Sequence, residues 1–123
     1  MPPQKNLTKP NSRAFRAQTG RKRPGIGYTE LPAEGCDLPI PKLPAGREWS
    51  RVERARWREL WQSPQATQWD DSVTGTVALL VTYEQMLLAG EGSAWTAAEA
   101  RHAADALGLT PRAMAALGWV IAS

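Results

Sequence analysis

Residues 49–69 read WSRVERARWRELWQSPQATQW and contain four of the six tryptophans of this 123-residue chain. Ser50 and Glu53 have the spacing of a capping box, in which each side chain accepts a hydrogen bond from the backbone N–H of the other residue. The segment therefore predicts a helix over residues 51–61. The Ser-Pro pair that follows indicates a further helical turn, because proline needs no N–H partner in the first turn of a helix.

The clustered tryptophans have two interpretations. Trp57 and Trp61 lie four residues apart on one helix face, so exposed rings between arginines would suit stacking on single-stranded nucleic acid. Tryptophan also buries much apolar area, which a small domain needs for its core. Three glutamates, Glu48, Glu53 and Glu59, nearly balance the neighbouring arginines. We therefore interpret the tryptophans as core and interface anchors.

Start and stop signals downstream predict further helices. An aspartate at position 70 or 71 caps the longest helix, Thr96 and Glu99 have the spacing of a second capping box, and glycines end the helices. The expected spans are residues 72–88, 96–107 and 111–118. No segment alternates apolar and polar residues over the length of a strand. We expect an all-α fold without a sheet, in the form of a small helical bundle or hairpin domain.

The longest predicted helix is apolar on most of its circumference. Such a helix must be covered on most sides, and so small a domain has few other elements for this. We therefore expect the domain to assemble into an oligomer, with coverage by the same chain as the alternative. The residues assigned to the oligomer interface are Val77, Leu79, Leu80, Tyr83, Met86 and Leu87.

The first 29 residues contain seven basic side chains and no acidic one, whereas the other 94 contain eight basic and twelve acidic groups. The first segment has few apolar side chains to offset the entropy of ordering, so residues 1–29 are predicted to be a disordered basic arm. Such an arm suits a polyanion such as double-stranded DNA, and a solubilising tail is the alternative. The candidate DNA-binding residues of the arm are Lys5, Lys9, Arg13, Arg16, Arg21, Lys22 and Arg23.

Residues 30–46 are predicted to be a linker rich in proline and glycine, and residues 47–123 a helical oligomerisation domain. Because proline disfavours helix at its own position and at the one before it, the linker should be extended. Its alternating Leu38, Ile40 and Leu43 would lie in a groove on the domain or on a neighbouring subunit. The alternative is a plain spacer.

Several classes of function are disfavoured. One cysteine, Cys36, and one histidine, His102, cannot complete a four-ligand zinc site, and a single thiol fits a reducing compartment. The sequence has no phosphate-binding loop motif and no acidic metal cluster. The longest apolar run is far shorter than a membrane span. We predict no enzyme activity, no metal, no cofactor and no membrane partner.

Residues 100–119 have the element order of a helix-turn-helix, with a glycine in the turn. Base readout needs several polar side chains, and the second helix offers only Arg112. A plain helical hairpin is therefore favoured, with Arg112 as a candidate DNA contact. The alternative is a transcription regulator that uses Arg101 and Arg112 in a helix-turn-helix.

The chain resembles the small terminase subunits of tailed phages, especially phages of actinobacteria. The resemblance rests on a basic, proline-rich N-terminus, the Leu-Pro pair at 43–44, the Trp–Ser-Pro–Ala–Trp pattern of residues 49–69 and the Gly-Leu-Thr-Pro sequence at 108–111. It implies a viral DNA-packaging adaptor in the cytoplasm of the bacterial host. Such a protein is α-helical and non-enzymatic, forms a ring, binds double-stranded DNA and regulates the large ATPase and nuclease subunit. A structural phage head or scaffold protein is a further alternative.

Overall fold

The computed structural model of the chain describes residues 27–123. Within this range the elements are, in chain order, β1 (Thr29–Leu31), α2 (Arg51–Trp61), the 3-10 helices η1 (Pro64–Gln68) and η2 (Asp71–Val73), α3 (Thr74–Leu88), α4 (Ala94–Ala106), α5 (Pro111–Leu117) and β2 (Trp119–Ile121). The fold is mainly helical, as the sequence predicts.

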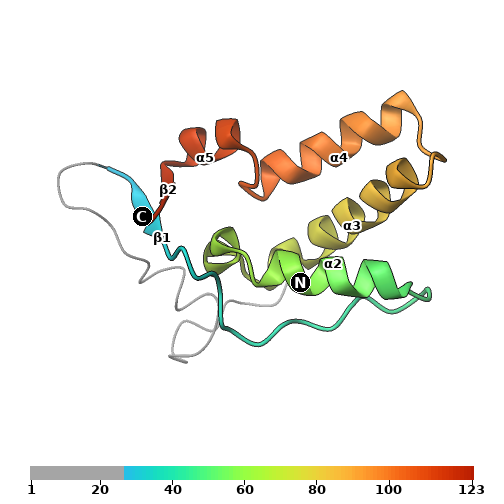
Figure 1. The fold of residues 1–123 in the computed structure, drawn as a ribbon, viewed down its shortest axis with the longest axis horizontal. Coiled ribbons are helices and arrows are strands. Elements are labelled where there is room, and N and C mark those ends of the chain that lie inside the picture. The colour runs from blue at the N-terminus through green and yellow to red at the C-terminus, as the bar shows by residue number, and fades with distance from the viewer. Residues whose placement is uncertain (1–26) are drawn as a thin grey trace.

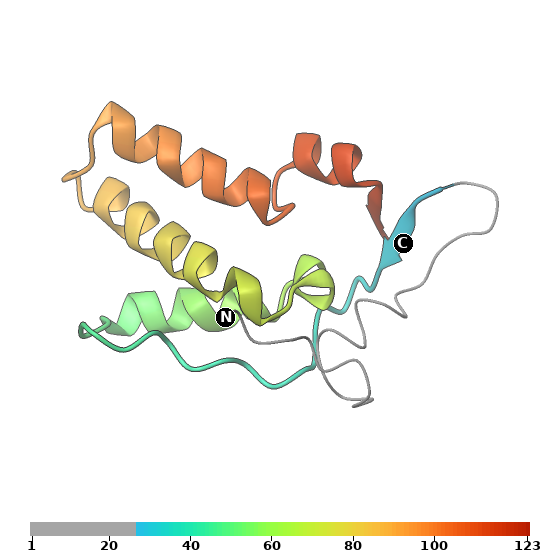
Figure 2. The same ribbon diagram turned by 180° about the vertical axis from the view of Figure 1, so that it is seen from behind.

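Helix α3 is the central element of the fold. Helix α4 follows it after a short turn and packs antiparallel to it, while α2 packs on its other side (Figures 1 and 2). Helix α5 and the two strands lie together at one end of the molecule. The core forms where these helices meet, around Trp57, Trp61, Trp69, Val77 and Leu80.

Helix α2 begins and packs as its sequence predicts. The Ser50 hydroxyl oxygen accepts a hydrogen bond from the backbone N–H of Glu53 at 3.1 Å, and the Glu53 carboxylate accepts one from the N–H of Ser50 at 2.9 Å. Trp57 and Trp61 are buried, with their ring centroids 5.6 Å apart. Their burial confirms the core interpretation and leaves neither ring free to stack on a base.

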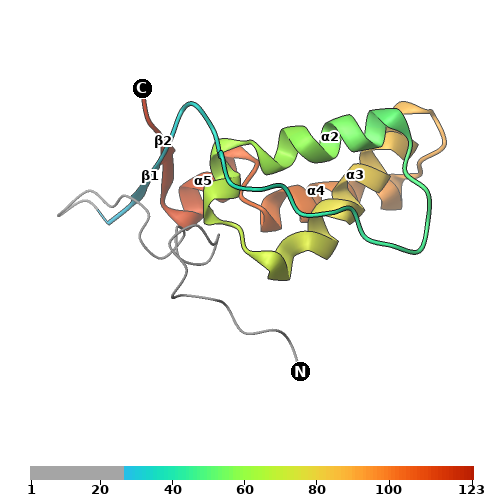
Figure 3. The same ribbon diagram turned by 90° about the horizontal axis from the view of Figure 1, so that it is seen from below.

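The proline-rich segment before α2 lies along the same chain's helices (Figure 3). The indole N–H of Trp57 donates to the carbonyl oxygen of Pro41 at 2.8 Å, and that of Trp49 donates to Pro44 at 3.0 Å. Leu38 is buried, and Ile40 and Leu43 pack against the core. Of the alternatives above, the segment is therefore a strap on its own domain rather than a plain spacer.

The expectation of a fold without a sheet was wrong. β1 and β2 form a parallel pair in which Thr29 lies opposite Trp119 and Leu31 opposite Ile121. Each strand has three residues, which is too few to show the alternation that marks a strand in a sequence. Thr29, assigned to the basic arm, and Leu31, assigned to the linker, are thus part of the folded unit. Residues 1–26 of the arm lie outside the described residues.

The start of α4 also differs from the prediction. Ser93, rather than Thr96, is its N-cap: the Ser93 hydroxyl accepts from the N–H of Thr96 at 3.2 Å, and the Thr96 hydroxyl accepts from the N–H of Ser93 at 3.1 Å. The pairs Ser93–Thr96 and Thr96–Glu99 both have cap-forming side chains three positions apart, so the sequence signal fits either start. The earlier start makes Thr96 part of α4 and places it among the buried residues.

Candidate nucleic-acid interface

The N-terminal end of the described chain lies beside the end of α5. The backbone N–H of Thr29 donates to the carbonyl oxygen of Gly118 at 2.7 Å. Gly118 follows α5 directly and has a φ of 73°, a left-handed conformation that glycine adopts without strain. The seven predicted arm cations all precede this point in the sequence. They lie outside the described residues, but the place where the segment joins the domain is defined.

The turn between α4 and α5 is held by local hydrogen bonds. The Thr110 hydroxyl caps α5 by accepting from the N–H of Ala113 at 3.1 Å, and it donates to the Asp105 carboxylate at 2.6 Å. Gly108 has a φ of 73°, and a Cβ there would lie 2.1 Å from the Trp119 ring. Only a residue without a side chain fits both this conformation and this contact.

Arg112 and Arg101 are both exposed, Arg112 in the first turn of α5 and Arg101 on α4. Arg112 is the only charged side chain of α5, a helix of seven residues. Along the axis of a helix, six residues span about 9 Å, so Arg112 lies about that far from Gly118. One side chain of this kind suits a phosphate contact better than base readout.

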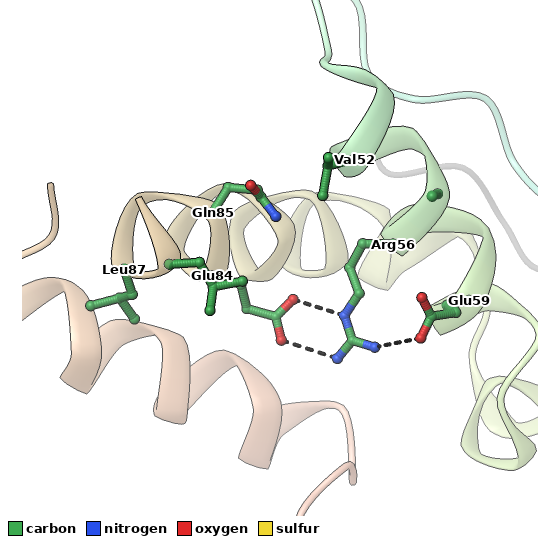
Figure 4. A pocket seen from close by; sticks show the side chains of 8 residues that line it. Val52, Arg56, Glu59, Glu84, Gln85 and Leu87 are labelled. Carbon is green, nitrogen blue, oxygen red and sulfur yellow. Dashed lines mark hydrogen bonds and ion pairs between the residues drawn. The ribbon is translucent and has the colours of Figure 1, made fainter. Parts of the chain in front are cut away.

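The arginines around α2 divide into two groups. Arg47 donates to the Glu53 carboxylate at 2.6 Å, and this hydrogen bond lowers the pKa of Glu53 below its usual value. Arg56 donates to Glu84 on α3 at 2.9 and 3.0 Å and to Glu59 at 3.2 Å (Figure 4). The hydrogen bonds to Glu84 raise the pKa of Arg56. These two arginines are therefore structural.

The other group comprises Arg51, Arg54 and Arg58, which are exposed. Among the residues that the structure describes, their side chains take part in no ion pair or hydrogen bond. On the sequence alone, the neighbouring glutamates nearly balance all of these arginines. The structure shows that the glutamates Glu53 and Glu59 form ion pairs with Arg47 and Arg56 instead. The sequence therefore did not identify Arg51, Arg54 and Arg58 as a candidate DNA-binding surface.

The residues assigned to an oligomer interface have different environments. Val77 and Leu80 are 0% and 2% exposed. Their own chain covers them, so their apolar character does not indicate an interface with a second chain. Tyr83 and Leu87 are half-buried and pack against the core, and Met86 is half-buried. Leu79 is 49% exposed and remains available to a second chain.

Two surface grooves flank α3. The one between α2 and α3 has a volume of about 490 Å³, and Figure 4 shows Val52 and Leu87 among its lining residues. The other has a volume of about 670 Å³ and is lined by Pro44, Trp49 and Leu79. Leu88, at the edge of the first groove, is 80% exposed.

Neither a metal site nor a membrane-spanning helix is found in the described part of the chain. Residues 27–123 contain no group of three His, Cys, Asp or Glu side chains placed to hold an ion. None of their helices has the length and apolar character needed to cross a bilayer. Cys36, the one cysteine of the sequence, is buried. His102 is an exposed helix residue whose Nδ1 lies 3.9 Å from the Glu99 carboxylate.

These features define a small, mainly α-helical protein with a basic N-terminal segment and exposed arginines on α2, α4 and α5. A family model described as phage terminase small subunit matches residues 8–117, and the chain belongs to this family. The resemblance seen in the sequence is thereby confirmed. No curated protein and no solved structure shows a significant match to the chain.

Family membership supports a role in phage DNA packaging. Small terminase subunits are generally non-catalytic, and phage terminases act in the host cytoplasm during packaging. The family also implies interaction with DNA and with the large terminase subunit.

Proposed function

We propose that this chain is the DNA-binding adaptor of a packaging motor, forms a closed ring and regulates the large ATPase and nuclease subunit without enzyme activity of its own. The observation that carries DNA binding is the β1–β2 pair, because it joins the basic segment to the domain beside α5. The seven arm cations and Arg112 can therefore reach the same duplex.

Charge distribution favours the arm as the main source of affinity. The residues before position 27 carry seven basic groups and no acidic one, and the remainder carries eight basic and twelve acidic groups. A folded part with net negative charge is repelled by DNA as a whole, so the arm must supply most of the attraction. If all seven cations meet phosphates, the logarithm of the binding constant falls with that of salt concentration at a slope of roughly −6 per arm.

The test is a comparison of two variants in binding to double-stranded DNA by fluorescence anisotropy over a range of salt concentrations. Deletion of residues 1–25 should abolish most of the affinity and flatten the salt dependence, whereas Arg112→Ala should weaken binding only slightly. If the deletion leaves affinity intact while Arg112→Ala abolishes it, the arm hypothesis is wrong. That result would favour the alternative function, a transcription regulator that uses Arg101 and Arg112.

Exposed apolar side chains support ring formation. Leu79, Leu88 and Trp95 are 49%, 80% and 62% exposed and lie on or beside α3, and large apolar groups on a helix surface are typical of contact sites. Native mass spectrometry separates the candidate functions: an adaptor should be a closed ring of many subunits, and a regulator a dimer. A scaffold protein should not bind DNA at moderate salt.

Regulation of the large subunit is tested by its ATP hydrolysis with and without this chain. The isolated chain should hydrolyse no ATP and cut no DNA. Metal-dependent cleavage that is lost on a single substitution in this chain would contradict the non-enzymatic assignment.

A further inference from the structure

We propose that Arg51, Arg54 and Arg58 on α2 form a second contact surface for the phosphate backbone of double-stranded DNA, separate from the arm and from Arg112. This inference rests on the proposed DNA-binding function and assigns a new part of the chain to it. The three residues are called the α2 arginine row below.

The first support is geometric. In a helix of 3.6 residues per turn, positions 51, 54 and 58 fall within about 60° of one another around the axis and span about 10.5 Å along it. The same helix buries Trp57, Leu60 and Trp61 in the core, while the three arginines are exposed. The row is therefore held on the outer face of a helix that is anchored to the core by its tryptophans. Double-stranded DNA carries one charge per about 1.7 Å of its axis, so several phosphates fit opposite the row.

The second support is the division of charge. Glu53 is engaged by Arg47 at 2.6 Å, and Glu84 and Glu59 are engaged by Arg56. The acidic groups closest in sequence to the row are thus occupied, apart from the exposed Glu48 before the helix. The folded part is net negative as a whole, yet five of its eight basic residues lie between positions 47 and 58. Cations concentrated in this way present a local positive surface.

The third support distinguishes DNA from other partners. Around the helix axis the exposed neighbours of the row are Ala55 and Gln62, and the exposed apolar Val52 lies about 100° from Arg51. The row itself thus lacks the apolar core that a protein interface has. All three residues are arginine, whose guanidinium binds phosphate with two parallel hydrogen bonds. The tryptophans of α2 are buried, so single-stranded DNA finds no stacking surface here. Contacts to the backbone of a duplex remain.

The row is distinct from the other candidate contacts. Helix α2 packs on one side of α3 and α4 on the other (Figure 1), and Arg112 belongs to α5, which follows α4. The row and Arg112 thus lie in separate parts of the fold. Each would add its own phosphate contacts.

The experiment compares the full-length chain with the triple variant Arg51→Ala/Arg54→Ala/Arg58→Ala and with a control of equal net charge, Ala94→Glu/Ala97→Glu/Ala106→Glu. The control places its changes at exposed positions of α4. Circular dichroism and thermal unfolding verify that both variants fold. Binding of a DNA duplex is measured by anisotropy between about 50 and 200 mM salt, the range in which phosphate contacts change affinity most clearly.

The triple variant should lose about tenfold or more in affinity at ~100 mM salt, and its salt slope should be less steep by about 2.7 per chain, since each phosphate contact contributes about 0.9. The control should lose less affinity and keep the slope of the unmodified chain. Equal losses in the two variants would show a net-charge effect and overturn the proposal. So would unchanged DNA binding combined with lost binding of the large subunit, which would assign the row to a protein partner.

The outcome also separates this inference from the proposed function. If the unmodified chain binds no duplex, both fail. If it binds, and deletion of residues 1–25 abolishes binding while the triple variant matches the unmodified chain in affinity and slope, only the α2 arginine row is excluded.

Discussion

Trp69 donates its indole N–H to the backbone carbonyl oxygen of Leu107 at 2.9 Å, and both residues are almost completely buried. Leu107 is the C-cap of α4, where backbone carbonyls have no partner within the helix. The bond therefore satisfies an acceptor that would otherwise be buried without one. It also connects the tryptophan-rich segment to the turn that precedes α5.

Trp69→Phe should lower the free energy of unfolding by about 2–3 kcal/mol, because it leaves the Leu107 carbonyl buried without a donor and removes part of a core ring. Trp95→Phe is the matched control. Trp95 is exposed and contacts Tyr83 through its ring, so its substitution should change stability by less than about 0.5 kcal/mol. Urea denaturation measures both, and equal effects would contradict the role of the hydrogen bond.

Gly108→Ala should be more destabilising than Gly90→Ala. The two glycines have similar φ values, 73° and 78°, but a Cβ at Gly108 would meet the Trp119 ring at 2.1 Å, whereas nothing lies within 4 Å of one at Gly90. Gly90→Ala should cost about 1–2 kcal/mol for the left-handed conformation alone. Gly108→Ala should cost at least about 2 kcal/mol more, since the ring must move. Thermal unfolding compares them directly.

Glu53→Gln should make stability less dependent on acid pH. The hydrogen bond from Arg47 lowers the pKa of Glu53, so this carboxylate contributes stability above its unfolded pKa of about 4.5, and the contribution is lost as pH falls through the lower folded value. At pH 7 the substitution should cost about 1–2 kcal/mol, and the variant and the unmodified chain should converge as pH falls below the lowered pKa of folded Glu53. Glu48→Gln, at an exposed position, is the control. A difference that stays constant with pH would contradict this linkage.

Leu79→Glu combined with Met86→Glu should yield monomers. Leu79 is exposed and Met86 half-buried on α3, and a charge at an apolar contact between chains is left without a partner. Sedimentation velocity at micromolar concentration gives the oligomeric state, and Ala97→Glu on the exposed face of α4 is the control. An unmodified chain that sediments as a stable monomer would refute oligomerisation itself.

The features that could be predicted from sequence are those set by neighbouring residues. Ser50 and Glu53 lie three positions apart, and the helix they cap was predicted with its observed bounds. Thr110 and Pro111 likewise mark the start of α5. A capping signal is contained in one short segment, because the side chain and the backbone groups it satisfies lie within one turn.

The features that could not be predicted join distant residues. Glu84 lies 28 positions from Arg56, so the sequence does not show which arginine it engages or that the α2 arginine row remains exposed. The apolar circumference of α3 indicated self-association, but Val77 and Leu80 are buried within one chain. They belong to a core cluster that also contains residues of α2, α4 and the proline-rich segment. Which apolar side chains of α3 remain exposed depends on how the other elements pack against it. The spacing of apolar residues along one helix does not show that packing.

The β1–β2 pair has a consequence for the order in which the protein forms. Thr29 and Trp119 are partners although they are 90 positions apart, from 29 to 119, and closing a loop of that length costs about 4 kcal/mol in chain entropy. During synthesis β1 leaves the ribosome well before its partner, because the four helices α2 to α5 lie between them in the sequence. The attachment of the basic segment to the domain is therefore completed only after α2 to α5 and β2 have been synthesised, and a product that ends before Trp119 lacks it.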